Sequence, residues 1–320
     1  MNFFLHCIFG IKEIVTSVYA YEGGFILGEQ QYTPIIAYLG PEASFTHIAA
    51  NELFGSSGLL ARPTIPDCIE AVASGHATYA VVPLENALEG SVPLTIDYMF
   101  NENDLYIQAE LSIPIEQHLM VHKEQQHHLN EIESVHSHPH ALAQCHKYLM
   151  YQYRGVPLIQ TTSTAAAAKY VSENPQLKIA AIGNRFACEK YELHMAEESI
   201  HDFHFNHTRF VVLAQRKGQI DVKGHSEHPK TTLMVKLPKD DRPGVLHQVL
   251  SVFSWRRLNL TKIESRPLKT GLGNYFFIID VMEDENAPLM KGAMEELAAL
   301  DCEVRSLGTY YSYEQKPTHA

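Results

Sequence analysis

The feature that most constrains the fold is a regular alternation of short apolar runs with helical patterns between residues 35 and 213. Runs such as Ile35–Leu39 and Tyr79–Val82 are each followed, after a turn, by a capped or proline-opened helical segment. Strands that alternate with helices of roughly 10 to 15 residues are typical of a parallel α/β sheet. We therefore predict an α/β domain over residues 35–213, which closes with a strand-like run at Phe210–Leu213.

The pattern changes after this domain. Residues 214–230 are polar and without a sustained apolar period, so we interpret them as a linker. Residues 231–308 follow the order βαββαβ, which indicates a small ferredoxin-like domain. Residues 1–34 are expected to be a poorly ordered extension, and 309–320 a C-terminal tail. Five apolar residues are predicted to share one face of the first helix of the small domain: Val245, Leu246, Val249, Leu250 and Phe253.

Composition excludes several classes of function. The 320 residues carry a net charge of -12, which argues against a nucleic-acid surface and means that an anionic substrate needs a local cluster of donors. No window has the roughly 18 apolar residues of a membrane span. Five cysteines without a CxxC pair, and a start that makes a poor signal peptide, predict reduced thiols and a cytoplasmic protein.

Polar residues follow several predicted strands, where ligands bind in parallel α/β sheets. The stretch "AVVPLENALEGSV" shows this most clearly, because an apolar strand ends in Glu85 and Asn86. Loops after strands are commonly polar, so each position alone also fits a structural role. Several loops that each offer hydroxyl or amide groups favour a binding site. The other positions are Ser44, Thr46, Ser137, His138, Thr208 and Arg209.

A family resemblance rests on motifs along most of the chain. "GPEASFT", "VVPLENALEGSV", "SHPHALAQC", "TSTAAAA", "AAIGN" and "NHTRFVVL" occur in the order and spacing of prephenate dehydratase. The second domain resembles the ACT domain of that enzyme through "RPGVLHQVL" and "NLTKIESRP". The resemblance covers residues from about 35 to 312. It implies a two-lobed catalytic domain like type II periplasmic binding proteins, joined to a regulatory ACT domain. It also implies a monofunctional enzyme, since 34 preceding residues are too few for a chorismate mutase bundle.

The resemblance implies that prephenate loses its ring carboxylate as CO2 and its C4 hydroxyl as water, giving phenylpyruvate. Aromatisation drives the reaction, so we expect neither cofactor nor metal. Thr208, Asn86 and Glu85 are the candidate catalytic residues. Threonine is a feeble acid, so Thr208 would act through a polarised hydrogen bond or a relay, or alternatively it only orders its loop. Glu85 would repel a dianion, so it is protonated, paired with Arg209, or turned away.

The resemblance also implies substrate-binding positions, which are Ser44, Thr46, Ser91, Ser137, Gln144, Ser163, Thr164, Arg209 and Phe210. Structural alternatives remain for several of them. Ser137 could cap a helix, Arg209 could pair with a neighbouring acid, and Phe210 could pack in the core. A histidine-rich stretch suggests a metal, but Pro139 interrupts it and no second ligand cluster follows at zinc-like spacing. Its members are His136, His138, His140, Cys145 and His146.

In the small domain, Gly244 precedes a helix whose free N–H groups could hold a carboxylate. The resemblance implies that L-phenylalanine binds there as a feedback effector between the ACT domains of two chains, so we expect a homodimer or homotetramer. Simple interdomain contacts are an alternative for the residues of "ESRP". The expected effector residues are Gly244, Val245, Leu246, Asn259, Leu260, Glu264 and Ser265.

Three other functions compete with this interpretation. Arogenate dehydratase removes the same groups from the aminated relative of prephenate. A catalytically silent phenylalanine sensor would tolerate loss of Glu85, Asn86 and Thr208, but all three are present. A secreted solute-binding protein would need an export signal. The sequence departs from the family pattern in places: Ala87 replaces a frequent hydroxyl residue, His140 a frequent glutamine, "PEASF" a frequent glycine-threonine pair, and "GVLH" differs mildly from the usual effector motif.

Overall fold

The computed structural model describes residues 4–9, 12–21, 24–101, 104–218, 220, 226–238, 243–268 and 275–315. The chain divides into two compact units. One comprises Thr33–Asn103, Leu111–Phe210 and Gln315–Ala320 and holds most of the predicted α/β domain. The other comprises Met1–Tyr32, Asp104–Glu110 and Val211–Glu314. Within the described residues, no helix is both long enough and apolar enough to cross a bilayer.

The first lobe of the α/β unit is built on a parallel sheet. Strand β4 pairs in parallel with β5 and with β6, and β14 and β8 extend the order to β8-β14-β6-β4-β5. The side chains of Ser44 and Thr64 cap the first two helices, as the sequence pattern suggests. The elements are β4 (Ile36–Leu39), α1 (Phe45–Phe54), β5 (Leu59–Arg62), α2 (Ile65–Ala73), β6 (Tyr79–Asn86), β7 (Gly90–Ser91), α3 (Pro93–Asn101), β8 (Tyr106–Pro114) and β14 (His207–Ala214).

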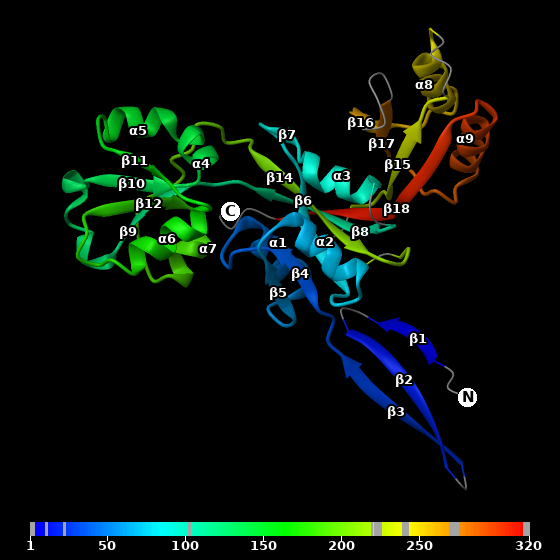
Figure 1. Cartoon of the computed structure of the whole chain (residues 1–320), viewed down its shortest axis with the longest axis horizontal. Coiled ribbons are helices and arrows are strands. Elements are labelled where there is room, and N and C mark those ends of the chain that lie inside the picture. Colours follow the sequence, from blue (N-terminus) through cyan, green and yellow to red (C-terminus); the bar gives the residue numbers. More distant parts are fainter. Residues whose placement is uncertain are drawn as a thin grey trace. The chain divides into compact units, whose positions relative to one another are not determined.

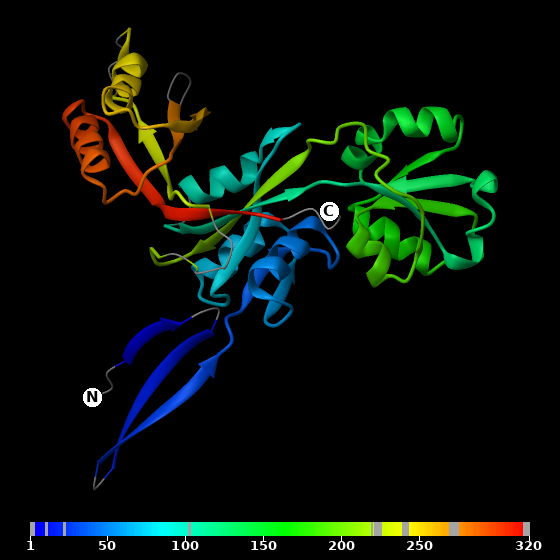
Figure 2. The same cartoon turned by 180° about the vertical axis from the view of Figure 1, so that it is seen from behind.

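The second lobe is a five-stranded sheet of order β11-β10-β12-β9-β13 with helices on both faces (Figures 1 and 2). Successive residues of β9 and β12 point to opposite faces, so Met120 and Ala181 pack under α6 and α7, whereas Leu119 and Ile182 pack under α4 and α5. The elements are β9 (His118–Val121), the short 3-10 helices η1 (Lys123–Gln125) and η2 (Leu129–Glu131), β10 (Ser134–Ser137), α4 (Pro139–Gln144), α5 (His146–Gln152), β11 (Leu158–Gln160), α6 (Thr164–Ser172), β12 (Ile179–Gly183), α7 (Arg185–Lys190) and β13 (His194–Glu197).

The chain passes between the lobes twice, after β8 and again before β14. These crossings are tied together, because Ile115 N donates to Asn206 O at 2.8 Å and Ile200 N donates to Gln117 O at 2.9 Å. Two lobes joined by paired crossing segments are the predicted arrangement of a type II periplasmic-binding-protein-like domain. The sequence prediction of the catalytic fold is therefore confirmed.

The small domain has the predicted βαββαβ order, and its antiparallel sheet runs β16-β17-β15-β18. Strand β18 continues through Glu314, so it passes the expected boundary at residue 308 without a break. The elements are β15 (Lys230–Lys236), α8 (Val245–Trp255), β16 (Leu260–Pro267), β17 (Tyr275–Val281), α9 (Pro288–Ala299) and β18 (Glu303–Glu314).

The buried face of α8 is narrower than predicted, since Val245 and Leu250 are only partly buried. Val249 and Phe253 are buried as expected, but Leu246 is 37% exposed, and Val252 is buried in the core instead. The reason is helical geometry. Val245, Val249, Val252 and Phe253 follow the i, i+4, i+7, i+8 spacing of one face, and Leu246 lies beside it.

The N-terminal residues form a separate three-stranded antiparallel sheet of β1 (Phe4–Phe9), β2 (Lys12–Tyr21) and β3 (Gly24–Tyr32). The sequence did not predict these strands. The expected loose packing of this extension stays a prediction.

Candidate functional site

The end of β6 lies beside the start of β14, which brings Asn86 next to Thr208. Ala87 N donates to His207 O at 2.9 Å and aligns the two segments. Asn86 Nδ2 then donates to Thr208 Oγ1 at 2.9 Å. Two residues that are 122 positions apart in the sequence therefore form one polar cluster.

The carboxamide of Asn86 is held from both ends. Its Oδ1 accepts from Leu88 N at 3.0 Å and Glu89 N at 3.2 Å, the pattern of an asparagine that closes its own turn. Its Nδ2 also donates to Asn206 Oδ1 at 2.9 Å. The amide donors of Asn86 are therefore directed at Thr208 and Asn206, and His207 O is a further acceptor at 3.4 Å.

Glu85, which precedes Asn86 on β6, pairs with Arg209, which follows Thr208 on β14. Arg209 Nη1 lies 2.6 Å from Glu85 Oε2, and the side chains are 20% and 29% exposed. Of the three states considered for Glu85, this structure has the pair with Arg209. Ser91 lies opposite Glu85 in the β6–β7 register, at the same edge. Phe210 is 2% exposed and packs in the core.

Predicted residues of the second lobe gather at the ends of β10 and β11. Thr161 N donates to Ser137 O at 2.9 Å, and Ser163 Oγ caps α6 by accepting from Ala166 N at 3.0 Å, which places Thr164 in the first turn. The alternative role of Ser137 as a helix cap is wrong. Its buried hydroxyl donates to Ile182 O at 2.7 Å, because the preceding strand runs one residue further than a cap at Ser137 would allow.

His138 caps α4 instead, and its Nδ1 accepts from His140 N at 3.3 Å. Burial lowers the pKa of His138, which favours the neutral ring that this cap requires. His140 in turn pairs with Glu89 of the first lobe, with Nδ1 and Oε2 2.7 Å apart. Within the described residues, the histidines here take part in no group of three that could hold a metal.

The remaining predicted substrate residues have mainly local partners. Ser44 Oγ accepts from His47 N at 3.2 Å and donates to Leu39 O at 3.1 Å, while Thr46 is buried in α1. Gln144 is the last residue of α4 and is half-buried. The geometry therefore forms two adjacent polar pairs, Asn86–Thr208 and Glu85–Arg209, and places the other predicted residues at the ends of helices and strands of the same unit.

Sequence reasoning missed Asn206 and Glu89. Asn206 is 3% exposed and lies two residues before Thr208, so the alternation of an extended strand puts both side chains on one face. That spacing was the available signal. The Glu89–His140 contact joins two lobes and has no local signal.

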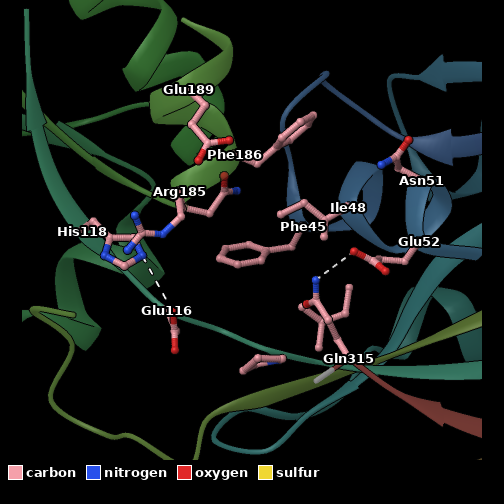
Figure 3. Close-up of a pocket in the computed structure, with 13 residues that line it drawn as sticks. Phe45, Ile48, Asn51, Glu52, Glu116, His118, Arg185, Phe186, Glu189 and Gln315 are labelled. Atoms are coloured by element: carbon pink, nitrogen blue, oxygen red, sulfur yellow. Dashed lines mark hydrogen bonds and ion pairs between the residues drawn. The ribbon is translucent and has the colours of Figure 1, made fainter. Parts of the chain in front are cut away.

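A cavity of about 270 Å³ lies elsewhere in this unit, between α1, the end of β8 and α7 (Figure 3). Phe45, Ile48 and Phe186 give it an apolar wall, and Glu116 and Arg185 are charged groups at its lining. It shares no lining residue with the Asn86–Thr208 cluster, so geometry and chemistry favour the cluster as the candidate site.

The predicted effector residues occupy the start of α8 and strand β16. Gly244 has a φ of 92°, a left-handed conformation that glycine adopts without strain, and no side chain caps the helix it opens. The first N–H groups of α8 thus lie at an exposed turn. Asn259 O accepts from Met282 N at 2.9 Å, and Glu264 lies 3.2 Å from Lys262. The sequence also predicts turns at "DDRPG" and "KTGLGN"; residues 240–242 of the first and 269–274 of the second fall outside the described residues.

Comparison with known proteins identifies the family. Residues 36–218 match the family model "Prephenate dehydratase", and residues 231–299 match the "ACT domain" model. The chain is 51% identical to a Bacillus subtilis protein named prephenate dehydratase, over 87% of this chain and 99% of that protein.

Two solved structures are similar over most of the chain. Prephenate dehydratase from Arthrobacter aurescens, in complex with L-Phe, has a TM-score of 0.74 and 30% identity, covering 86% of this chain and 89% of that one. A quorum-quenching acylase, GqqA, has a TM-score of 0.75 and 25% identity, covering 87% and 98%. With two family models in sequence and a relative that is half identical along nearly its whole length, the chain belongs to the prephenate dehydratase family.

Proposed function

We propose that this chain converts prephenate to phenylpyruvate, CO2 and water, and that L-phenylalanine regulates the reaction through the ACT domain. The observation that carries the proposal is the hydrogen bond from Asn86 to Thr208 at the end of β6. The names of the relatives support the substrate, and the L-Phe complex of the Arthrobacter aurescens enzyme supports the effector.

The reaction needs help at the leaving hydroxyl. The bond between the ring and its carboxylate breaks and its electron pair completes the aromatic ring, while the C4–O bond breaks and the oxygen leaves as hydroxide, which takes up a proton to become water. Thr208 donates a hydrogen bond to that oxygen as negative charge develops on it. Because the bond strengthens as the C4–O bond breaks, it stabilises the transition state more than the bound substrate.

The Glu85–Arg209 pair reduces the repulsion that an unpaired Glu85 carboxylate would exert on the dianionic substrate. Arg209 compensates the charge of Glu85, and a guanidinium has five N–H groups, so it can hold one substrate carboxylate while it remains near Glu85. We propose that Arg209 holds the side-chain carboxylate. We propose that the ring carboxylate is not held by a comparable cation, which would favour its loss as CO2. Closure of the two lobes would exclude water from the site.

The direct test is an assay of phenylpyruvate formation from prephenate, with and without phenylalanine. We expect turnover by the purified chain and its reduction by excess phenylalanine, together with a higher melting temperature. Arogenate in a parallel reaction measures the competing specificity. Absence of turnover of prephenate would overturn the proposed activity, and an unchanged rate and melting temperature with phenylalanine would overturn the regulation.

We further propose a homodimer or homotetramer formed through the ACT domains, because the expected effector site lies between two chains. Cytoplasmic localisation is proposed on the state of the thiols. Cys68, Cys145, Cys188 and Cys302 are free and buried, as in proteins of reducing compartments. Size-exclusion chromatography with light scattering, with and without phenylalanine, tests the assembly.

A further inference from the structure

We propose that Asn206 is a positioning residue for the reaction. It fixes the carboxamide of Asn86, and through it sets the hydroxyl of Thr208 as a hydrogen-bond donor toward the leaving group. The inference rests on the proposed function of Thr208. It is carried by one chain of hydrogen bonds, in which Asn86 Nδ2 donates to both Asn206 Oδ1 and Thr208 Oγ1, each at 2.9 Å.

The first step concerns the orientation of Asn86. A carboxamide has two N–H donors and one oxygen with two lone pairs. Here the oxygen accepts from Leu88 N and Glu89 N, and the two N–H groups face Asn206 and Thr208. Rotation by 180° would set the amide nitrogen against two backbone N–H groups and the amide oxygen against Asn206 Oδ1. The observed orientation therefore depends on acceptors at the nitrogen end.

The second step concerns the proton of Thr208. A hydroxyl carries one proton and can accept at its oxygen. Because Thr208 Oγ1 accepts from Asn86, its own proton must point along another direction. A donated hydrogen bond also polarises the O–H bond of the acceptor, which makes it a better donor in turn. Asn86 therefore both orients and strengthens Thr208 as a donor.

The third step concerns Asn206, which is the last residue in this series of hydrogen bonds. Its side chain is 3% exposed and its Oδ1 accepts from Asn86 Nδ2, so it is placed to hold Asn86. If its acceptor is removed, one N–H of the half-buried Asn86 loses a 2.9 Å hydrogen bond and keeps only a 3.4 Å contact to His207 O, which costs up to about 1–3 kcal/mol. The carboxamide then gains freedom to rotate. The bond from Ile115 N goes to the backbone oxygen of Asn206, so it survives substitution of the side chain.

The test compares Asn206→Leu, which removes the acceptor at similar volume, with Asn206→Asp, which keeps an oxygen there. We expect kcat for prephenate to fall on the order of 10- to 100-fold in the leucine variant, with KM within about threefold, since this is the loss of one buried acceptor. The aspartate variant should recover most of kcat. If the leucine variant fails to fold, Asn206→Ala takes its place. Near-normal kcat in the leucine or alanine variant would overturn the inference.

A double variant separates positioning from a general structural role. If Asn206 acts through Thr208, Asn206→Leu should cause no further loss of kcat in a Thr208→Ala background, because the affected hydroxyl is already absent. An equal loss in both backgrounds would overturn the inference. Failure of the proposed function has a different signature, namely near-normal turnover by Thr208→Ala itself.

Discussion

Two ion pairs of equal length occupy very different surroundings. Arg209–Glu85 in the α/β unit and Lys230–Glu110 in the other unit both have nitrogen and oxygen 2.6 Å apart. The first pair is 20% and 29% exposed, and the second only 11% and 5%. Glu110 Oε1 also accepts from Ser312 Oγ at 2.9 Å. Distance alone therefore does not tell a candidate binding pair from a structural one, whereas solvent access does.

The difference has an energetic meaning. Charges removed from water have lost their hydration, so removing one partner leaves the other unpaired in a medium that cannot solvate it. A half-buried pair keeps part of its hydration and can exchange a partner for a ligand group at lower cost. We infer that the Lys230–Glu110 pair stabilises its unit, and that Arg209–Glu85 is available to a substrate carboxylate.

The largest expected effect is on stability. Lys230→Met should lower the free energy of unfolding by about 3–5 kcal/mol, because it strands the buried Glu110 carboxylate. Steady-state kcat/KM should stay within about twofold of the unmodified chain. Urea denaturation followed by circular dichroism measures the first quantity.

Lys236→Met is the matched control for that experiment. Lys236 lies on the same strand and is also 2.6 Å from its partner, Glu303, but the side chains are 31% and 71% exposed. Its loss should cost below about 1 kcal/mol. Equal losses in the two variants would contradict the distinction by solvent access.

The second effect is on catalysis. Arg209→Met should reduce kcat/KM on the order of 100-fold, because a charge-assisted pair of hydrogen bonds to substrate is lost. Arg209→Lys should recover only part of this loss, since an ammonium cannot form two parallel bonds. If Arg209→Met instead destabilised the fold by several kcal/mol and left kcat/KM intact, Arg209 would be a structural residue like Lys230.

A third region, the crossing between the lobes, contains two buried histidine rings, one of which has Glu116 Oε2 3.9 Å from His118 Nε2. His118 Nδ1 accepts from Ser199 N at 3.0 Å, and His201 Nδ1 accepts from Gln117 N at 3.3 Å. Burial lowers the pKa of both rings below the ordinary 6.5, so the folded state disfavours their protonation.

Stability should therefore respond to acid through these rings. Their contribution to the free energy of unfolding is present above pH 6.5 and is lost as the pH falls below that value. In that range the unfolded chain binds more protons at these histidines than the folded chain does. The free energy of unfolding measured from pH 7.5 to 5.5 should fall, and the fall should be shallower in a His118→Gln/His201→Gln variant. An unchanged slope in that variant would contradict this assignment.

Local patterns explain why the fold was predictable and part of the site was not. The spacing of apolar residues, every two in a strand and every 3.6 in a helix, predicted β6, α6 and the βαββαβ domain. Each of these elements is encoded within a short stretch of sequence. The same patterns placed Asn86 and Thr208 at strand ends. The partner of Glu85, Arg209, lies 124 residues away along the sequence. Pairing with Arg209 was therefore only one of three states that the sequence allowed for Glu85.

Single-residue shifts account for two of the differences. The N-cap of α4 is His138 and not Ser137, because β10 extends through Ser137. Helix boundaries inferred from sequence commonly differ by a residue or two. Leu246 lay one position off the buried face of α8. Asn206 lies within the "NHTRFVVL" motif. Its contact with Asn86 Nδ2 could not be predicted, because the two residues are 120 positions apart and meet only in the folded chain.

The central claim is that the hydroxyl of Thr208 assists departure of the leaving hydroxide. The most direct measurement is kcat for phenylpyruvate formation from prephenate by Thr208→Ala and Thr208→Ser, with melting temperatures as a check on folding. The account predicts a fall of about 10²- to 10⁴-fold in the alanine variant and substantial recovery in the serine variant, which restores a hydroxyl at the same position. Near-normal turnover by a folded alanine variant would contradict it.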